Sequence, residues 1–256
     1  MEYIDIATKE RIMSSNNVII AENMKKIYDA GKKSQYDEFW DTFQAYGKLE
    51  KYNSAFSHCR FNKETFKPKY PLRIIVGEFT FAYQRKAHNT HFIGEPIHDL
   101  IQVCKDNNIM IDTSKATELN SMFYASDFTT IPTISFESQS GAIRGVFYAN
   151  SQLETIEKII FKADGSNTFT TNSWELPFGG CSALKNLVIE GVIGDSFNIS
   201  SSPLTKESIT SVVNALSSTS SGKTVSFSKS AKTNAFSDSE WSTLIATKSN
   251  WTFSLV

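Results

Sequence analysis

The sequence predicts an α/β fold: a leucine-rich-repeat-like solenoid with short parallel strands, preceded by a helical N-terminal segment. Three observations predict it. Short apolar strand patterns recur along the chain, aromatic residues precede several of them at similar distances, and helix and strand patterns alternate near the C-terminus. We therefore expect a helical segment over residues 1–50 and the solenoid over residues 51–256.

Six short strand patterns define the expected repeat. Their last apolar residues are Ile111, Phe136, Phe161, Ile189, Phe227 and Phe253. The intervals between these residues are 25, 25, 28, 38 and 26, and four of the five fit the roughly 20–29 residues of a leucine-rich repeat. We expect the long interval to hold an insertion. One strand and its return segment cannot bury their apolar side alone, so we expect the six side chains to stack in one interior column.

A second set of aromatic residues recurs at similar distances before the strand ends. Phe123, Phe147 and Phe178 precede the ends of their strands by 13, 14 and 11 residues. Towards the C-terminus, Thr205 is a plausible N-cap, and Ser237 and Glu240 have the spacing of a capping box. These signals give three helix–strand units, over residues 96–112, 205–228 and 237–255.

The N-terminal segment shows apolar residues at helical spacing. They fall into two sets, Met24, Ile27 and Tyr28, then Tyr36, Phe39, Trp40 and Phe43. Gly31 separates the sets, which indicates two short helices or one kinked helix. This aromatic stripe is expected to pack on the rest of the protein, and an oligomerisation helix is the alternative.

Composition excludes some partners. The chain has 26 basic and 27 acidic residues and a net charge of −1, so no strong field draws in a nucleic acid. No apolar run reaches the roughly 18–20 residues of a membrane span. No secretory signal is visible at the N-terminus, so either one was trimmed or the protein leaves the cell without one. The three cysteines, Cys59, Cys104 and Cys181, are expected to be free thiols.

Several stretches resemble a known group of proteins. Residues 28–44, 119–126 and 204–216 are similar to segments of leucine-rich-repeat proteins of gut Firmicutes and their prophages, and the repeats resemble the BspA type. This resemblance implies a solenoid without catalytic residues or cofactor, acting as a surface-binding module or in a phage tail. Residues 73–96 depart from the pattern, which leaves the repeat register there open.

Motifs for catalysis or metal binding are incomplete. The Ser221–Thr224 stretch resembles the end of a phosphate-binding loop but lacks the first glycine, and a helix precedes it instead of a strand. His88, His91 and His98 are expected to be loop histidines without zinc. Asp164 starts a turn rather than a calcium loop. We therefore expect no enzyme, no cofactor and no metal.

The expected strands place alternate side chains on an exposed sheet face. If Ile134 and Phe136 point inward, their neighbours point outward. The candidate binding residues on this basis are Asp112, Ser135, Glu137, Ile160, Lys162, Val188, Glu190 and Ser226. They form either a ligand platform or an ordinary solvated sheet.

These features predict a non-enzymatic binding or adhesion module for a protein or glycan partner. A structural component of a phage tail or baseplate is the alternative, and an enzyme acting on cell-wall glycan is the third. The expected location is extracellular, on the cell surface or in a virion, with no membrane span. The N-terminal helices could form an oligomer.

Overall fold

The computed structural model describes residues 52–53, 55–57, 66–68, 70–83 and 97–256. The helical segment expected over residues 1–50 lies outside these residues, as do His88, His91 and most of the open register between 73 and 96. The described part is a mixed α/β fold with four helices and several small parallel sheets. In chain order its elements are β1 (Leu72–Arg73), α4 (Leu100–Asp106), β2 (Ile111–Asp112), β3 (Thr130–Ile131), β4 (Ile134–Ser135), β5 (Thr155–Ile160), β6 (Asn186–Glu190), β7 (Phe197–Asn198), α5 (Lys206–Ala215), β8 (Lys223–Phe227), α6 (Lys229–Ala235), α7 (Asp238–Ala246) and β9 (Trp251–Leu255).

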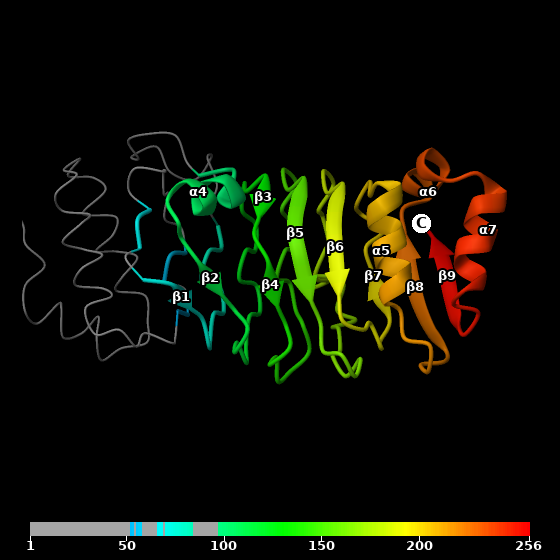
Figure 1. The fold of residues 1–256 in the computed structure, drawn as a ribbon, viewed down its shortest axis with the longest axis horizontal. Helices are drawn as coiled ribbons and strands as arrows, with labels where there is room; N and C mark the ends of the chain where they lie inside the picture. Colours follow the sequence, from blue (N-terminus) through cyan, green and yellow to red (C-terminus); the bar gives the residue numbers. More distant parts are fainter. Residues whose placement is uncertain (1–51, 54, 58–65, 69, 84–96) are drawn as a thin grey trace, which may run out of the picture.

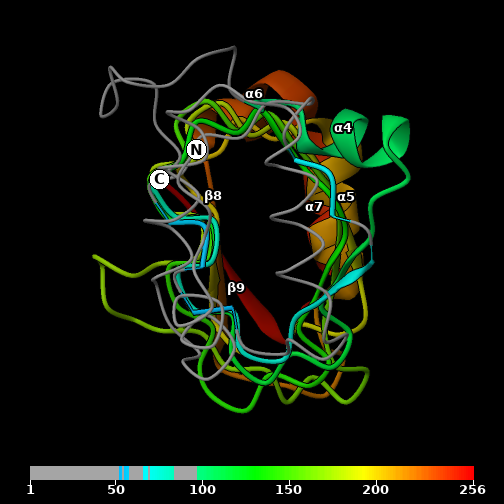
Figure 2. The same ribbon diagram turned by 90° about the vertical axis from the view of Figure 1, so that its left-hand side faces the viewer.

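All strand pairs in the described residues are parallel. One sheet pairs β1 with β2, a second places β3 and β4 on one edge of β5 and β6 on the other, and a third has the order β7-β8-β9. The strands cross the long axis of an elongated molecule and follow one another along it (Figure 1). Seen along that axis, successive segments trace similar oval outlines, with α4, α5 and α7 on one side and β8 and β9 on the other (Figure 2).

A ladder of phenylalanine rings runs through the interior. Its members, in order along the molecule, are Phe56, Phe81, Phe123, Phe147, Phe178 and Phe197. Neighbouring ring centroids are 5.3–6.0 Å apart, and each ring is almost fully buried. The expected landmark residues Phe123, Phe147 and Phe178 therefore lie in one column, and the structure extends that column at both ends.

The column expected from the strand ends is shorter than predicted. Phe136 stacks on Phe161 with ring centroids 5.8 Å apart. Ile189, however, pairs with Ile159 instead of Phe161. The register places Gly191 beside Phe161, and its backbone passes so close that a Cβ there would lie 2.1 Å from the Phe161 carbonyl oxygen. No side chain can follow Phe161 in the column at that point.

Ile111, the first residue of the expected column, belongs to a different sheet. It lies on β2, which pairs with β1 through Leu72. The link from β2 towards β4 is a side-chain contact, in which the N–H of Ser135 donates to Oγ1 of Thr113 over 2.7 Å. Strand periodicity located Ile111 in a strand but could not show which strand is its neighbour.

Phe227 and Phe253 were also wrongly placed in that column. Their strands, β8 and β9, continue from β7, with Phe197 paired to Val225 and Val225 to Phe253. Strands β8 and β9 therefore lie on the side of the molecule that carries the phenylalanine ladder. The 38-residue interval results from this change of side and not from an insertion.

Helix α5 takes the place beside β6 where a further strand would pair. The N–H of Leu187 donates to Oγ of Ser208 over 2.9 Å, and that of Ile189 to Oγ of Ser211 over 2.8 Å. Two hydroxyl groups of the helix thus satisfy edge donors of β6, which an unpaired strand would leave open. This explains why the sheet of β4, β5 and β6 ends at this point.

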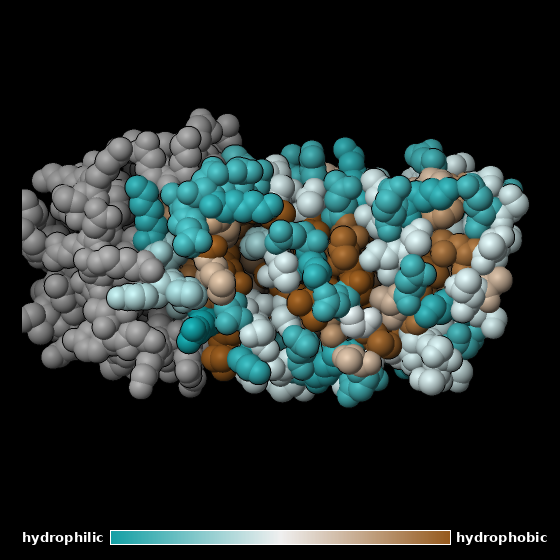
Figure 3. Space-filling view, in the orientation of Figure 1, coloured by the Kyte–Doolittle hydropathy of each residue, from teal (hydrophilic) through white to brown (hydrophobic). Residues whose placement is uncertain are grey.

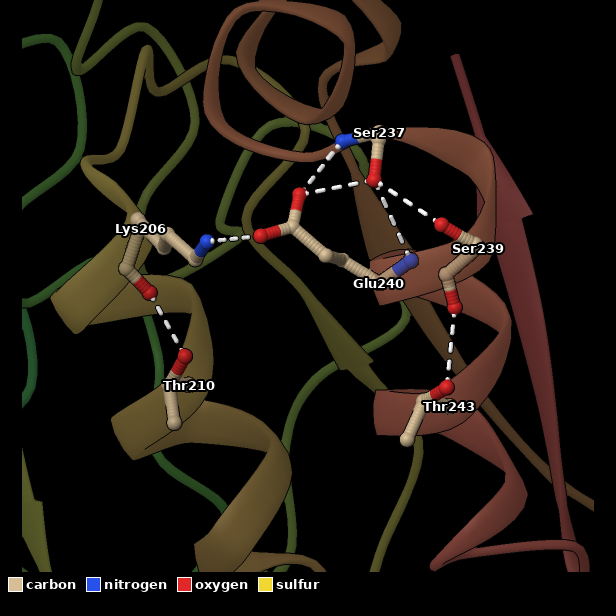
Figure 4. Close-up of polar contacts among 6 residues, drawn as sticks. All are labelled: Lys206, Thr210, Ser237, Ser239, Glu240 and Thr243. Carbon is tan, nitrogen blue, oxygen red and sulfur yellow. Dashed lines mark hydrogen bonds and ion pairs between the residues drawn. The ribbon is translucent and has the colours of Figure 1, made fainter.

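The helix caps expected near the C-terminus are present. Thr205 caps α5, and Ser237 and Glu240 form a capping box at α7 in which each side chain bonds to the other residue's backbone N–H (Figure 4). Glu240 also binds Nζ of Lys206 over 2.6 Å, which ties α7 to α5. Between β8 and α7 the structure adds α6, which the sequence did not predict.

Candidate binding face

The candidate binding face is the outer surface of β4, β5 and β6. The register aligns Ser135, Ile160 and Glu190 across the three strands. Val188, two residues before Glu190, is 49% exposed, which is high for a large apolar side chain in the middle of a strand. Figure 3 shows hydrophobic surface over β6, bordered by hydrophilic residues.

A β-bulge shapes this face. Ile156 pairs with Leu187 and Ile159 with Ile189, so Glu157 and Lys158 together lie opposite Val188 alone. A bulge re-aims side chains and is often a retained feature rather than a defect. Its effect here is to place a charged pair beside the exposed valine.

One ion pair lies on the face, and Glu157 beside it accepts hydrogen bonds. Nζ of Lys158 lies 2.9 Å from Oε2 of Glu190, across β5 and β6. Glu157 accepts hydrogen bonds from the N–H and the hydroxyl of Thr133, over 3.3 and 3.1 Å. Exposed pairs of this kind contribute about 0–1 kcal/mol to stability. They can therefore exchange for contacts with a partner at small cost.

The structure brings together three of the candidate residues and places two more near them. Ile160, Val188 and Glu190 lie on the adjacent strands β5 and β6, whereas Glu137 and Lys162 follow the ends of β4 and β5. Glu137 and Glu190 are exposed, and Ile160 and Lys162 are half-buried.

Ser135 is buried, which contradicts its expected exposure. Only 4% of its surface is accessible. Its hydroxyl donates to Oε2 of Glu137 over 3.0 Å, and Ile160 is its neighbour in the sheet. The side chain is small, so these two larger neighbours cover it even on an outward position.

Asp112 and Ser226 belong to other sheets than the strands of the candidate binding face. Asp112 is on β2, where its carboxylate accepts hydrogen bonds from the N–H and the hydroxyl of Ser114. Ser226 is on β8, in the sheet on the opposite side of the molecule from α5 and α7. Side-chain alternation gave their strand positions but not the sheet to which each strand belongs.

Sequence reasoning missed one prominent aromatic residue. Trp174 is 76% exposed in the connection between β5 and β6. Its N–H donates to Oδ1 of Asn172 over 3.2 Å, in a turn of polar residues. The sequence did hold a signal for it. Trp174 stands within a run of polar residues, and that run shows neither strand nor helix periodicity.

Potential metal ligands and nucleophiles do not converge among the residues that the structure describes. No group of three His, Cys, Asp or Glu side chains there has the geometry to hold a metal ion. Burial raises the pKa of the Cys104 and Cys181 thiols to about 12, so neither forms a reactive thiolate at neutral pH. Lys223 of the phosphate-loop-like stretch binds Asp195 over 2.8 Å.

No protein-family profile, curated protein or solved structure matches this chain. Within the described residues, every helix is too short or too polar to cross a membrane.

Proposed function

We propose that this chain is a leucine-rich-repeat-like solenoid, similar to the BspA type, that acts as a non-enzymatic binding module. It presents the candidate binding face to a protein or glycan partner outside the cell, on a cell surface or a virion. The fold part of the proposal is supported by the parallel pairing of successive strands and by the phenylalanine ladder, because stacked repeats bury a continuous core in this way.

A repeated side-chain contact further supports a solenoid. The residue three positions after a ladder phenylalanine donates to the carbonyl of the phenylalanine one step earlier in the column. Ser126 bonds to the Phe81 carbonyl over 2.8 Å, and Asn150 bonds to that of Phe123 over 2.7 Å. The Cys181 thiol bonds to the Phe147 carbonyl over 3.0 Å. Equivalent residues thus perform equivalent roles in consecutive repeats.

The backbone repeats as well. Phe79, Ser121 and Gly145 have positive φ angles of 53°, 55° and 51°. Four residues further along the chain, Ala125 and Ala149 again have positive φ. A left-handed conformation costs a residue with a side chain roughly 1–2 kcal/mol. Its recurrence at matched positions indicates one turn geometry that each repeat retains.

The observation that carries the binding proposal is the exposed Val188 beside Ile160 on a rigid sheet, with paired charges around them. Binding interfaces have apolar centres and polar rims, and sites on regular elements are held in place better than sites on loops.

The test compares two arginine variants in the full chain. Ile160→Arg places a charge at the centre of the candidate binding face, and Ser226→Arg makes the same addition on the opposite side of the molecule. The probes are a printed glycan array and immobilised collagen and fibronectin. We expect the wild-type chain to bind at least one probe, Ile160→Arg to lose at least about tenfold in affinity, and Ser226→Arg to bind normally.

Stability is the control for this comparison. Both positions are partly exposed, so each variant should change the free energy of unfolding by less than about 1 kcal/mol. Normal binding by a folded Ile160→Arg variant would move the site elsewhere. Failure of the wild-type chain to bind any probe would contradict the choice of partner classes.

A further inference from the structure

The last strand, β9, has one open edge. The N–H of Val256 donates to the Phe227 carbonyl, and the Val256 carbonyl accepts from Lys229. Backbone groups of a strand point alternately to its two sides, so those of Phe253 and Leu255 point away from β8. Nothing in the described part of the chain pairs with β9 on that side. The strand therefore offers a row of free donors and acceptors at the C-terminal end of the described stack (Figure 1).

This edge lacks the usual protection against pairing. Natural edge strands carry lysine, proline or a bulge, or are covered by another element, as α5 covers β6. Residues 251–256 contain no charged residue and no proline, and the register of β9 with β8 is regular over five residues. Leu255 and Val256 are 38% and 72% exposed. An open, uncharged and apolar edge of this kind is a template for another strand.

We propose that β9 pairs in antiparallel orientation with β9 of a second copy of this chain, about a two-fold axis at Phe253. In that register the Phe253 backbone groups of the two copies bond to each other. The N–H of each Leu255 donates to the carbonyl of Trp251 in the other copy. The Trp251 N–H makes no bond across the seam, because it already bonds to the Lys248 carbonyl. Four hydrogen bonds then join the copies end to end in one continuous sheet.

In this register, side chains of one β9 strand lie opposite side chains of similar polarity in the other copy. Trp251 lies opposite Leu255, and Phe253 opposite its own copy, which brings aromatic and aliphatic groups together on one face. Thr252 lies opposite Ser254, which brings hydroxyl groups together on the other. Such cross-strand pairs each stabilise a sheet by roughly 0.2–1 kcal/mol.

The neighbouring helix α7 exposes mostly uncharged side chains, and its first residue, Asp238, is paired with Lys232. The exposed side chains of α7 at Ser242, Thr243 and Ala246 are uncharged. Glu240 is paired with Lys206, as Figure 4 shows. Nζ of Lys248 donates to the carbonyl oxygens of two α5 residues. Lys229, whose N–H bonds to the Val256 carbonyl, adds one exposed charge, while Asp238, Glu240 and Lys248 have partners, so this end suits an identical copy better than a strongly charged partner.

The first test measures the molar mass of the full chain by light scattering during size-exclusion chromatography over a range of concentrations. We expect a dimer that Leu255→Lys weakens at least about tenfold, because two lysines would face the new seam. Leu255→Pro should weaken it as much, since proline removes an N–H that points away from β8. Ser151→Lys, an exposed substitution in the turn before β5, is the matched control and should leave the dimer intact.

The second test examines the register. Thr252 and the Ser254 of the other copy would form a non-hydrogen-bonded pair with Cα atoms about 4.5 Å apart, within disulfide range. With Cys59 replaced by Ser, a mixture of Thr252→Cys and Ser254→Cys chains should oxidise to a covalent dimer faster than either chain alone. Cys104 and Cys181 are buried and should not interfere.

Two outcomes would overturn the proposal. The first is a wild-type chain that stays monomeric at the highest concentration reached. The second is a dimer that both Leu255 variants leave unchanged, which would place the contact elsewhere, for example in residues 1–50. These outcomes concern self-association alone and are independent of whether Ile160→Arg alters partner binding.

Discussion

Replacing Phe161 with serine removes a ring that joins the two sides of the interior. Phe161 is 2% exposed. Its ring stacks on Phe136 at 5.8 Å and meets the edges of Phe169 at 5.5 Å and Phe197 at 6.3 Å. Truncation of a buried phenylalanine to alanine costs about 3–5 kcal/mol. A serine hydroxyl without a buried partner adds about 1–3 kcal/mol.

The expected loss for Phe161→Ser is therefore at least about 4 kcal/mol in the free energy of unfolding. Urea denaturation followed by circular dichroism measures it directly. For a chain of this size each kcal/mol lowers the Tm by roughly 2–4 °C, so thermal melting should shift by at least about 8 °C. Val188→Ser, on the exposed side of the adjacent strand, is the control and should cost less than about 1 kcal/mol.

A loss below about 1 kcal/mol for Phe161→Ser would refute this reasoning. That range is typical of surface positions, and it would mean that Phe161 does not lie between the two sides of the core. A loss of similar size in both variants would mean that the inward and outward sides of β5 and β6 are wrongly assigned.

Three further changes test single contacts. Gly191→Ala should lower the free energy of unfolding by more than about 2 kcal/mol in urea titrations, because φ is +84° and the new Cβ meets the backbone oxygen of Phe161, whereas Gly141→Ala, with open space around it, should be nearly neutral. Ser208→Ala leaves a buried N–H of β6 without an acceptor and should cost about 1–3 kcal/mol by the same measurement, and wild-type stability would show that α5 does not satisfy that edge. The ion pair with Lys206 and the capping-box hydrogen bonds lower the pKa of Glu240 to about 2 from its ordinary 4.5, so its stabilising effect is present above pH 4.5 and is lost as the pH falls towards 2. The stability difference between wild type and Glu240→Gln should shrink over that interval, and a constant difference would contradict the pairing.

Local signals in the sequence located most of the elements near the C-terminus. The capping box at Ser237 and the N-cap at Thr205 form with backbone groups only three residues away, so spacing alone specifies them. The alternation around Val188 likewise set which side chains of β6 face outward, because successive residues of a strand point to opposite sides. The recurrence of Phe123, Phe147 and Phe178 indicated a shared column before any neighbour was known.

Such local signals could not show which strands are neighbours in the fold. Periodicity treated Phe227 and Phe253 like Phe161, although β8 and β9 follow β7 on the other side of the molecule. The register of β5 with β6 pairs Ile189 with Ile159 and leaves Gly191, not Ile189, beside Phe161. Ser135 is covered in part by Ile160, which lies beside it only after β4 and β5 pair.

The sequence by itself thus determined the helices α5 and α7, parts of the strands β5, β6, β8 and β9, and which side of β6 is apolar, because these depend on contacts a few residues apart. Only the tertiary structure decided which of the described strands are neighbours and where α5 replaces a strand. Those outcomes depend on hydrogen bonds and packing between residues about 20–30 positions apart, such as the Leu187 N–H and the Ser208 hydroxyl. Apolar patterns of the same period are compatible with more than one such arrangement.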